Sequence, residues 1–377
     1  MTVFIPGVGF RSDAGLTARA PVTVMDGTRR GIRVTRFVAT DSATEVVFEV
    51  RDDDREEAAG EGRVDFHWAE RSQVGLRDEQ GRSPARVAGL GNGISMGQHQ
   101  FGFFGQRVVF EPLPPDARRV TLEVRGVLGE WDVPLDLVPV TEADVTPAIP
   151  IGAEQELHGV TLRVVSLAIT ASATIVEIEA DVGPGATAAE IGDGMRGGGG
   201  EGFALVDGSG SRLAELSTHD RMHMRGPLGG RTVVSFPRTE SRALTVEIPA
   251  VVVQEREGTL EFDLPIFAPV DLMFGRHPVR IRYAAAVDRL AAAPGDEPRP
   301  GIEVQLGDES HDGRRVVRPG PIHVDGVHCD YSILGGGDPW MERINIPMAD
   351  AESARRVRMG KPVVAVRGPW RISFTLL

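Results

Sequence analysis

The stretch Gly31–Val50, GIRVTRFVATDSATEVVFEV, decides the fold, because a second stretch of the chain repeats its pattern. Gly159–Ala180, GVTLRVVSLAITASATIVEIEA, has the same leading glycine and the same Ser-Ala-Thr triplet near its middle. Apolar and polar residues alternate in both stretches, as at Val46, Phe48 and Val50. A period of two places one face of a strand on a core and the other in water, so the pattern predicts antiparallel β-sheets.

Further segments repeat in the same order and at a nearly constant offset, which indicates a duplicated module. The matched pairs are Val74–Asp78 with Phe203–Asp207, Val120–Val124 with Leu244–Ile248, and Leu135–Leu137 with Phe262–Leu264. A weaker match joins Gly129–Leu137 to Gly368–Leu376 and aligns Trp131 with Trp370. The repeats predict an N-terminal extension at 1–20, a first sandwich at 21–143, a second at 144–275 and a diverged third at 276–377.

Strands separated by short turns favour an all-β fold of tandem immunoglobulin-like antiparallel β-sandwiches. Helical pattern is sparse, and only Asp350–Val357 and Ala284–Ala293 could make short helices. Cys329 is the single cysteine, so each sandwich core has to be held by packing without an intrachain disulfide.

Composition excludes several classes of protein. The net charge is −13 and no basic stripe is visible, so we expect no nucleic-acid partner. No apolar run approaches the length of a membrane-spanning helix, and no signal peptide is evident, so cytoplasmic location is the default expectation.

The order of these segments resembles the immunoglobulin-like repeats in the extracytoplasmic part of bacterial anti-sigma factors and related uncharacterised proteins. The shared pattern is a glycine-led strand pair, a strand running into an Asp-x-x-Gly turn, and a late strand pair with alternating apolar residues. The resemblance covers residues 21–270 and implies an immunoglobulin-like fold. It implies no sigma-factor role, because the transmembrane helix and the N-terminal zinc-binding segment of those proteins have no counterpart in this sequence.

The richest collection of metal-ligand residue types lies at His323–Asp330. His323, His328 and Cys329 could hold zinc or iron, with His311 and Asp330 as further candidates for a hydrolase site. Two features favour a structural interpretation. His328 and Cys329 are adjacent, so on a strand they point to opposite faces, and Asp325-Gly326 is a strong signal for a two-residue hairpin turn.

Three other motifs carry weaker hypotheses. His219, Met222 and His223 would suit Cu(I), but the favoured interpretation is a strand or loop whose methionines fill the core or a contact between sandwiches. Gly93–Gly97 matches the nucleophile elbow of hydrolases but lacks the following helix. The acidic run at 52–57 lacks the ligand spacing of a calcium loop.

No cluster of catalytic groups emerges from the sequence, and no cofactor is expected. The leading hypothesis is therefore a non-enzymatic protein that acts in protein–protein interaction or structural assembly, with a protein partner. The alternatives are a metal-binding protein or hydrolase with its site in the C-terminal sandwich, and an exported ligand-sensing module.

Overall fold

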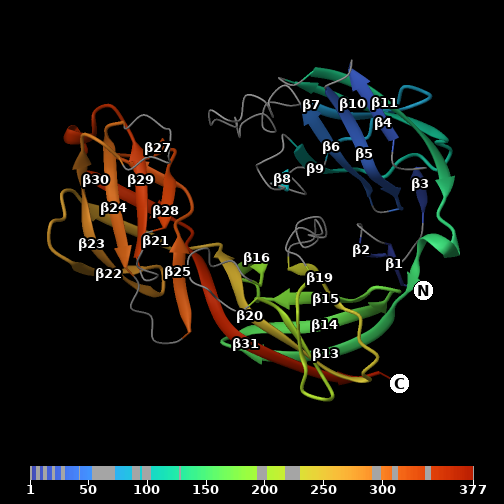
Figure 1. Cartoon of the computed structure of the whole chain (residues 1–377). Coiled ribbons are helices and arrows are strands. Elements are labelled where there is room, and N and C mark those ends of the chain that lie inside the picture. The colour runs from blue at the N-terminus through green and yellow to red at the C-terminus, as the bar shows by residue number, and fades with distance from the viewer. Residues whose placement is uncertain are drawn as a thin grey trace. The chain divides into compact units, whose positions relative to one another are not determined.

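The computed structural model describes residues 2–5, 9–11, 15–18, 22–26, 30–41, 43–52, 73–86, 94–95, 103–126, 129–192, 202–216, 230–290, 299–307, 313–335 and 341–376 (Figure 1). These residues form six sheets, with two short 3₁₀ segments, η2 (Glu142–Asp144) and η3 (Ala351–Ser353). The expectation of an all-β chain of antiparallel sheets is confirmed. Ala284–Ala286 lie in a strand, so the expected helix there is wrong, and near Asp350 only η3 forms.

The chain divides into two compact units, each discontinuous in sequence. The first comprises residues 1–152, 164–178 and 215–240, and the second comprises 153–163, 179–214 and 241–377.

A nine-stranded sheet dominates the first compact unit. Its order is β7 (Gln73–Asp78), β10 (Arg119–Gly126), β11 (Gly129–Pro139), β3 (Leu16–Ala18), β5 (Arg30–Ala39), β6 (Thr44–Asp52), β9 (Phe103–Phe110) and β8 (Ile94–Ser95), while β4 (Val22–Asp26) pairs with β5. Strand β3 lies within the expected N-terminal extension, yet it pairs with both β11 and β5 and so is part of the nine-stranded sheet.

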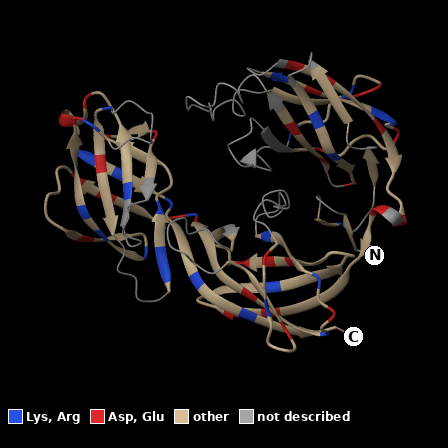
Figure 2. Cartoon of the chain, viewed as in Figure 1, with Lys and Arg blue, Asp and Glu red and all other residues tan. Residues whose placement is uncertain are grey.

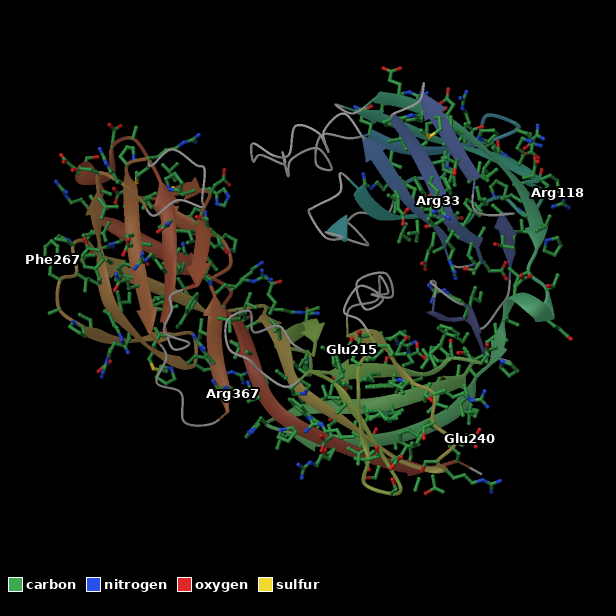
Figure 3. The ribbon with its side chains drawn as sticks, in the orientation of Figure 1. Arg33, Arg118, Glu215, Glu240, Phe267 and Arg367 are labelled. Carbon is green, nitrogen blue, oxygen red and sulfur yellow. The ribbon has the colours of Figure 1, made fainter. Side chains whose placement is uncertain are left out.

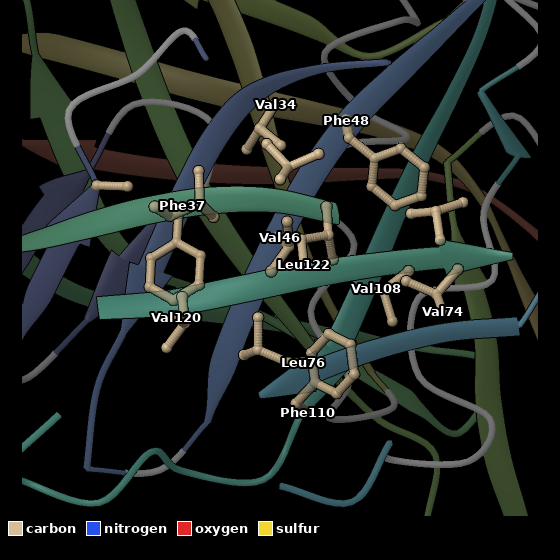
Figure 4. Packing of buried hydrophobic residues seen from close by; sticks show 14 of the residues in the cluster. Val34, Phe37, Val46, Phe48, Val74, Leu76, Val108, Phe110, Val120 and Leu122 are labelled. Carbon is tan, nitrogen blue, oxygen red and sulfur yellow. The ribbon is translucent and has the colours of Figure 1, made fainter. Parts of the chain in front are cut away.

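The core of this sheet forms where its two ends face each other (Figure 4). Phe37, Phe48 and Phe110 from the β5–β6–β9 end are buried together with Leu76 and Leu122 from the β7–β10–β11 end. Removal of these apolar side chains from water supplies the main driving force for folding of the sandwich.

A separate three-stranded sheet contains the N-terminal strands. Its strands are β12 (Thr146–Pro147), β1 (Val3–Ile5) and β2 (Gly9–Arg11). Phe4 and Phe10 are buried with Ile175 and Val233, and their ring centroids are 5.3 Å apart.

The remaining sheets follow in chain order. One has the order β13 (Ile149–Leu157), β14 (Val160–Ile169), β15 (Ala173–Asp181) and β19 (Arg231–Pro237). A six-stranded sheet has the order β18 (Arg212–Ala214), β17 (Ala204–Asp207), β20 (Ala243–Glu255), β31 (Val363–Thr375) and β25 (Arg314–Arg318), with β16 (Ala186–Ile191) paired to β20.

A two-sheet sandwich occupies the sequence between β20 and β31. One sheet has the order β21 (Thr259–Asp263), β30 (Arg356–Gly360), β26 (Ile322–Val324) and β27 (Val327–Cys329). The other has the order β22 (Val270–Phe274), β23 (His277–Val287), β24 (Gly301–Gly307), β29 (Met341–Pro347) and β28 (Ser332–Gly335). Both sheets contribute to one core, which includes Phe262, Val357 and Ile322 from the first and Phe274 and Val304 from the second.

The repeated sequence segments adopt the same local structures. The amide of Thr40 donates to Ala43 O, and the amide of Ala43 donates to the Thr40 hydroxyl; Thr170 and Ala173 make the same pair of bonds. Asp78 accepts backbone amides two and four residues ahead, and so does Asp207. The matched sequence segments therefore form turns with the same hydrogen bonds.

The strand register shows that β31 pairs with β20 as β11 pairs with β10. Val124 on β10 pairs with Trp131 on β11, and Ile248 on β20 pairs with Trp370 on β31. The two matched segments thus fall on β11 and on the end of β31, the strands that pair with β10 and β20. The expected boundary at 275/276 falls inside the turn between β22 and β23, two strands of one sheet.

Candidate functional site

The β26–β27 hairpin carries the densest group of candidate ligands, and its turn is the one that Asp-Gly predicts. Val324 pairs with Val327, and Asp325 and Gly326 have φ values of 48° and 84°. Two positive φ values define a type I′ turn, whose twist matches that of the flanking strands. The Asp325 carboxylate accepts the backbone amides of Arg355 and Arg356, which fixes the hairpin against β30.

This hairpin brings His323 and His328 together and separates them from Cys329. The two histidines are cross-strand partners, with ring centroids 5.4 Å apart and planes tilted by 58°. Cys329 pairs with Ile322 instead and packs against the core of the C-terminal sandwich. Within the described part of the chain, no group of three or more His, Cys, Asp or Glu residues is placed to hold a metal ion.

Charged residues continue the outer face of this sheet beyond the histidines. Arg358 is the partner of His323 on β30, and Glu261 is the partner of Arg358 on β21. Arg356 contacts Asp263 at 2.8 Å and Glu261 at 3.1 Å, and its hydrogen bond to Asp263 raises the pKa of the guanidinium. Figure 2 marks the positions of acidic and basic residues along the ribbon, and both kinds occur on the strands of the C-terminal sandwich.

The other sequence candidates lie wholly or partly outside the described residues. His219, Met222 and His223 fall outside them, as do Gly93 and Gly97 of the elbow motif, of which only Ile94–Ser95 is described as strand β8. His311 and most of the acidic run at 52–57 are also outside them. These candidates remain predictions.

A buried ionisable cluster that the sequence analysis missed lies where β20 meets the β22–β23 hairpin. His277 and Glu255 are each less than a tenth exposed, and His277 Nε2 lies 2.9 Å from Glu255 Oε1. Arg276, which is largely exposed, donates to the same oxygen at 2.9 Å. Burial alone would raise the pKa of Glu255, but these bonds outweigh it and the pKa lies below its ordinary value. Glu255 is about twenty residues from Arg276 and His277 in sequence, so no local sequence motif predicts the cluster.

Strand β22 forms one edge of its sheet, since no described strand pairs with its other side. Three large apolar side chains are exposed on or beside it: Phe267 at 72%, Met273 at 55% and Val270 at 39%. The Phe267 ring lies 6.2 Å from that of Tyr283, and Figure 3 shows Phe267 at the β22–β23 end of the sheet. Apolar groups concentrated at one sheet edge are typical of a contact surface.

Comparisons with known proteins give no named family. No protein-family model matches the chain, and no curated protein matches it. One solved structure, a conserved domain protein from Bacillus anthracis, aligns over 65% of this chain and 81% of its own length, with 10% sequence identity and a TM-score of 0.32. In the described residues, no helix is long and apolar enough to span a membrane.

Proposed function

We propose that the chain consists of immunoglobulin-like sandwiches and acts in structural assembly, by pairing strand β22 with β22 of a second copy. The first two sandwiches are copies of one module, and the second is completed by β31. The third sandwich is inserted between β20 and β31. The matched turns and the matched Trp131 and Trp370 registers support this organisation. The exposed apolar edge at β22 is the observation that carries the assembly role.

The hairpin geometry fixes which backbone groups of β22 face outward. Gly275 and Arg276 make a two-residue turn, so Phe274 and His277 form a hydrogen-bonded pair and the pairs then alternate. Asp271 and Met273 fall at the alternate positions, opposite Arg280 and Pro278. Their N–H and C=O groups therefore point away from β23. An antiparallel strand added at this edge would form its hydrogen bonds with these two residues.

A second copy of β22 satisfies this edge when Leu272 lies on the two-fold axis. Asp271 then faces Met273 of the second copy, and both copies exchange a total of four backbone hydrogen bonds. The two Asp271 carboxylates avoid each other, and each keeps its own Arg280, whose hydrogen bond lowers the pKa of Asp271. The exposed Met273 side chains gain cover from the facing strand.

The contact is short, so association should be weak. Two residues in each copy exchange backbone hydrogen bonds, and only part of each Met273 side chain is covered, so the gain is small beside the free energy lost on association. We expect a dissociation constant of about 0.1 mM or weaker.

Sedimentation equilibrium over a concentration range reaching about ten times that constant tests the proposal. Met273→Glu places a carboxylate against Asp271 of the second copy and should abolish dimerisation, whereas Met273→Lys places an ammonium there and should preserve it. Met25→Glu is the matched control, because Met25 is an exposed methionine on β4. A wild-type chain that stays monomeric throughout, or equal effects of the Glu and Lys changes at 273, would overturn the proposal.

A further inference from the structure

The His323–His328 pair has the geometry of two ligands to one ion. Val324 and Val327 flank the two-residue turn, so the next pair outward, His323 with His328, is a non-hydrogen-bonded pair. Side chains approach each other most closely at such positions. His323 is half-buried and His328 is exposed, so water and ions reach the pair directly.

The separation of the rings matches what a shared ion requires. A metal–nitrogen distance of about 2.0–2.1 Å, with the ring centre roughly 1.1 Å behind the nitrogen, puts two imidazole centres of a tetrahedral ion about 5 Å apart. The observed separation is 5.4 Å. Rotation of the two side chains about χ1 and χ2 would aim one nitrogen of each ring at a common point.

Among the described residues, no third His, Cys, Asp or Glu is placed to join the two histidines. Cys329 points to the core face, and the Asp325 carboxylate already accepts the amides of Arg355 and Arg356. Arg358, beside His323, disfavours a cation through like charge, although its long exposed side chain can extend towards Glu261. Water would complete the coordination shell of an ion held here.

We propose that His323 and His328 form a surface site for a divalent transition-metal ion of the Zn²⁺, Ni²⁺ or Cu²⁺ class, without Cys329. Imidazole suits these ions, and the order of affinities should follow their general preference for nitrogen ligands, with Cu²⁺ binding most tightly. The site lies on the β26–β27 hairpin and does not depend on pairing at β22.

Zinc titration calorimetry on the full chain tests this proposal, with Zn²⁺ chosen because it does not oxidise the thiol. His323→Gln and His328→Gln should each weaken one Zn²⁺ site by a factor on the order of ten or more. Cys329→Ser should leave that site unchanged. His158→Asn is the control, since His158 is an exposed histidine at positive φ, which Asn tolerates. Arg358→Gln should raise the affinity about threefold by removing a like charge.

The proposal is overturned if the wild-type chain binds no Zn²⁺, or if either His323→Gln or His328→Gln leaves Zn²⁺ affinity unchanged. It is also overturned if Zn²⁺ binding at this site is lost in His158→Asn or in Cys329→Ser. The last result would mean that the cysteine, which faces the core, is a ligand after all. Circular dichroism of each variant checks that the fold is kept, and both histidine side chains lie on the outer face of the sheet, where Gln is well accommodated.

Discussion

Replacement of the two matched tryptophans by phenylalanine should have unequal effects on stability. Trp370 is fully buried, and its indole N–H donates to Val160 O at 3.3 Å. Trp131 holds the matching register position on β11 and is 4% exposed, but its buried N–H has no hydrogen-bond partner among the described residues. The two changes remove the same atoms from equivalent positions and differ in this one bond.

The magnitude follows from that difference. Each change loses apolar contact and leaves a small cavity, which costs about 1–2 kcal/mol. Trp370→Phe also loses a hydrogen bond worth about 1 kcal/mol, whereas Trp131→Phe removes a buried donor whose desolvation was uncompensated, a gain of about 1 kcal/mol. We therefore expect Trp370→Phe to destabilise its sandwich by about 2 kcal/mol more than Trp131→Phe destabilises the first.

Hydrogen exchange followed by mass spectrometry is the suitable assay, because a chain of two compact units need not unfold in one step. Peptides covering β20 report on Trp370→Phe, and peptides covering β10 report on Trp131→Phe. A loss of protection in β10 that equals or exceeds the loss in β20 would refute the reasoning.

Three further predictions concern the insertion of the C-terminal sandwich. Glu255→Gln should destabilise the chain by about 2 kcal/mol at neutral pH, because it weakens the buried contact with His277, and thermal unfolding measures this. The stability difference between wild type and Glu255→Gln should shrink in acid. The pKa of Glu255 is lowered in the folded state, so its stabilisation is present above the unfolded pKa of 4.5 and is lost as the pH falls through the folded pKa. Equal stability differences at pH 3 and pH 7 would contradict this expectation. Gly258→Ala should cost more than Gly210→Ala in the same assay. Both have positive φ, but a Cβ at 258 would lie 2.9 Å from Pro362 Cδ. At 210 no atom of the described residues lies within 4 Å, so strain alone costs about 1 kcal/mol.

The strands could be predicted from the sequence where alternation is clear and turns carry Asp, Gly or Thr. Asp78 and Asp207 hold equivalent turns, and Ser209 lowers the pKa of Asp207 by hydrogen bonding to its carboxylate. The Asp325-Gly326 hairpin was also predictable, because the turn type depends on those two residues. The local sequence pattern therefore predicts where these strands and turns lie.

Connectivity between distant strands could not be predicted in the same way. Trp370 aligned with Trp131 in sequence, but the sequence alone does not say that β31 returns to β20 across the inserted strands. Ala284–Ala286 has the composition of a helix and forms a strand because β24 pairs with it and Ala284 is buried in the core. The His277–Glu255 pair likewise depends on tertiary contact.

Disulfide trapping at the β22 edge tests the assembly role most directly. In a Cys329→Ser background, Leu272→Cys would place two thiols on the two-fold axis, with Cα atoms about 4.5 Å apart at a non-hydrogen-bonded pair, which is within disulfide reach. Asp271→Cys would hold its two thiols roughly 8 Å apart at Cα, beyond that reach. We predict a covalent dimer under mild oxidation for the first variant and a monomer for the second. Equal cross-linking of both variants, or of neither, would contradict pairing through this strand.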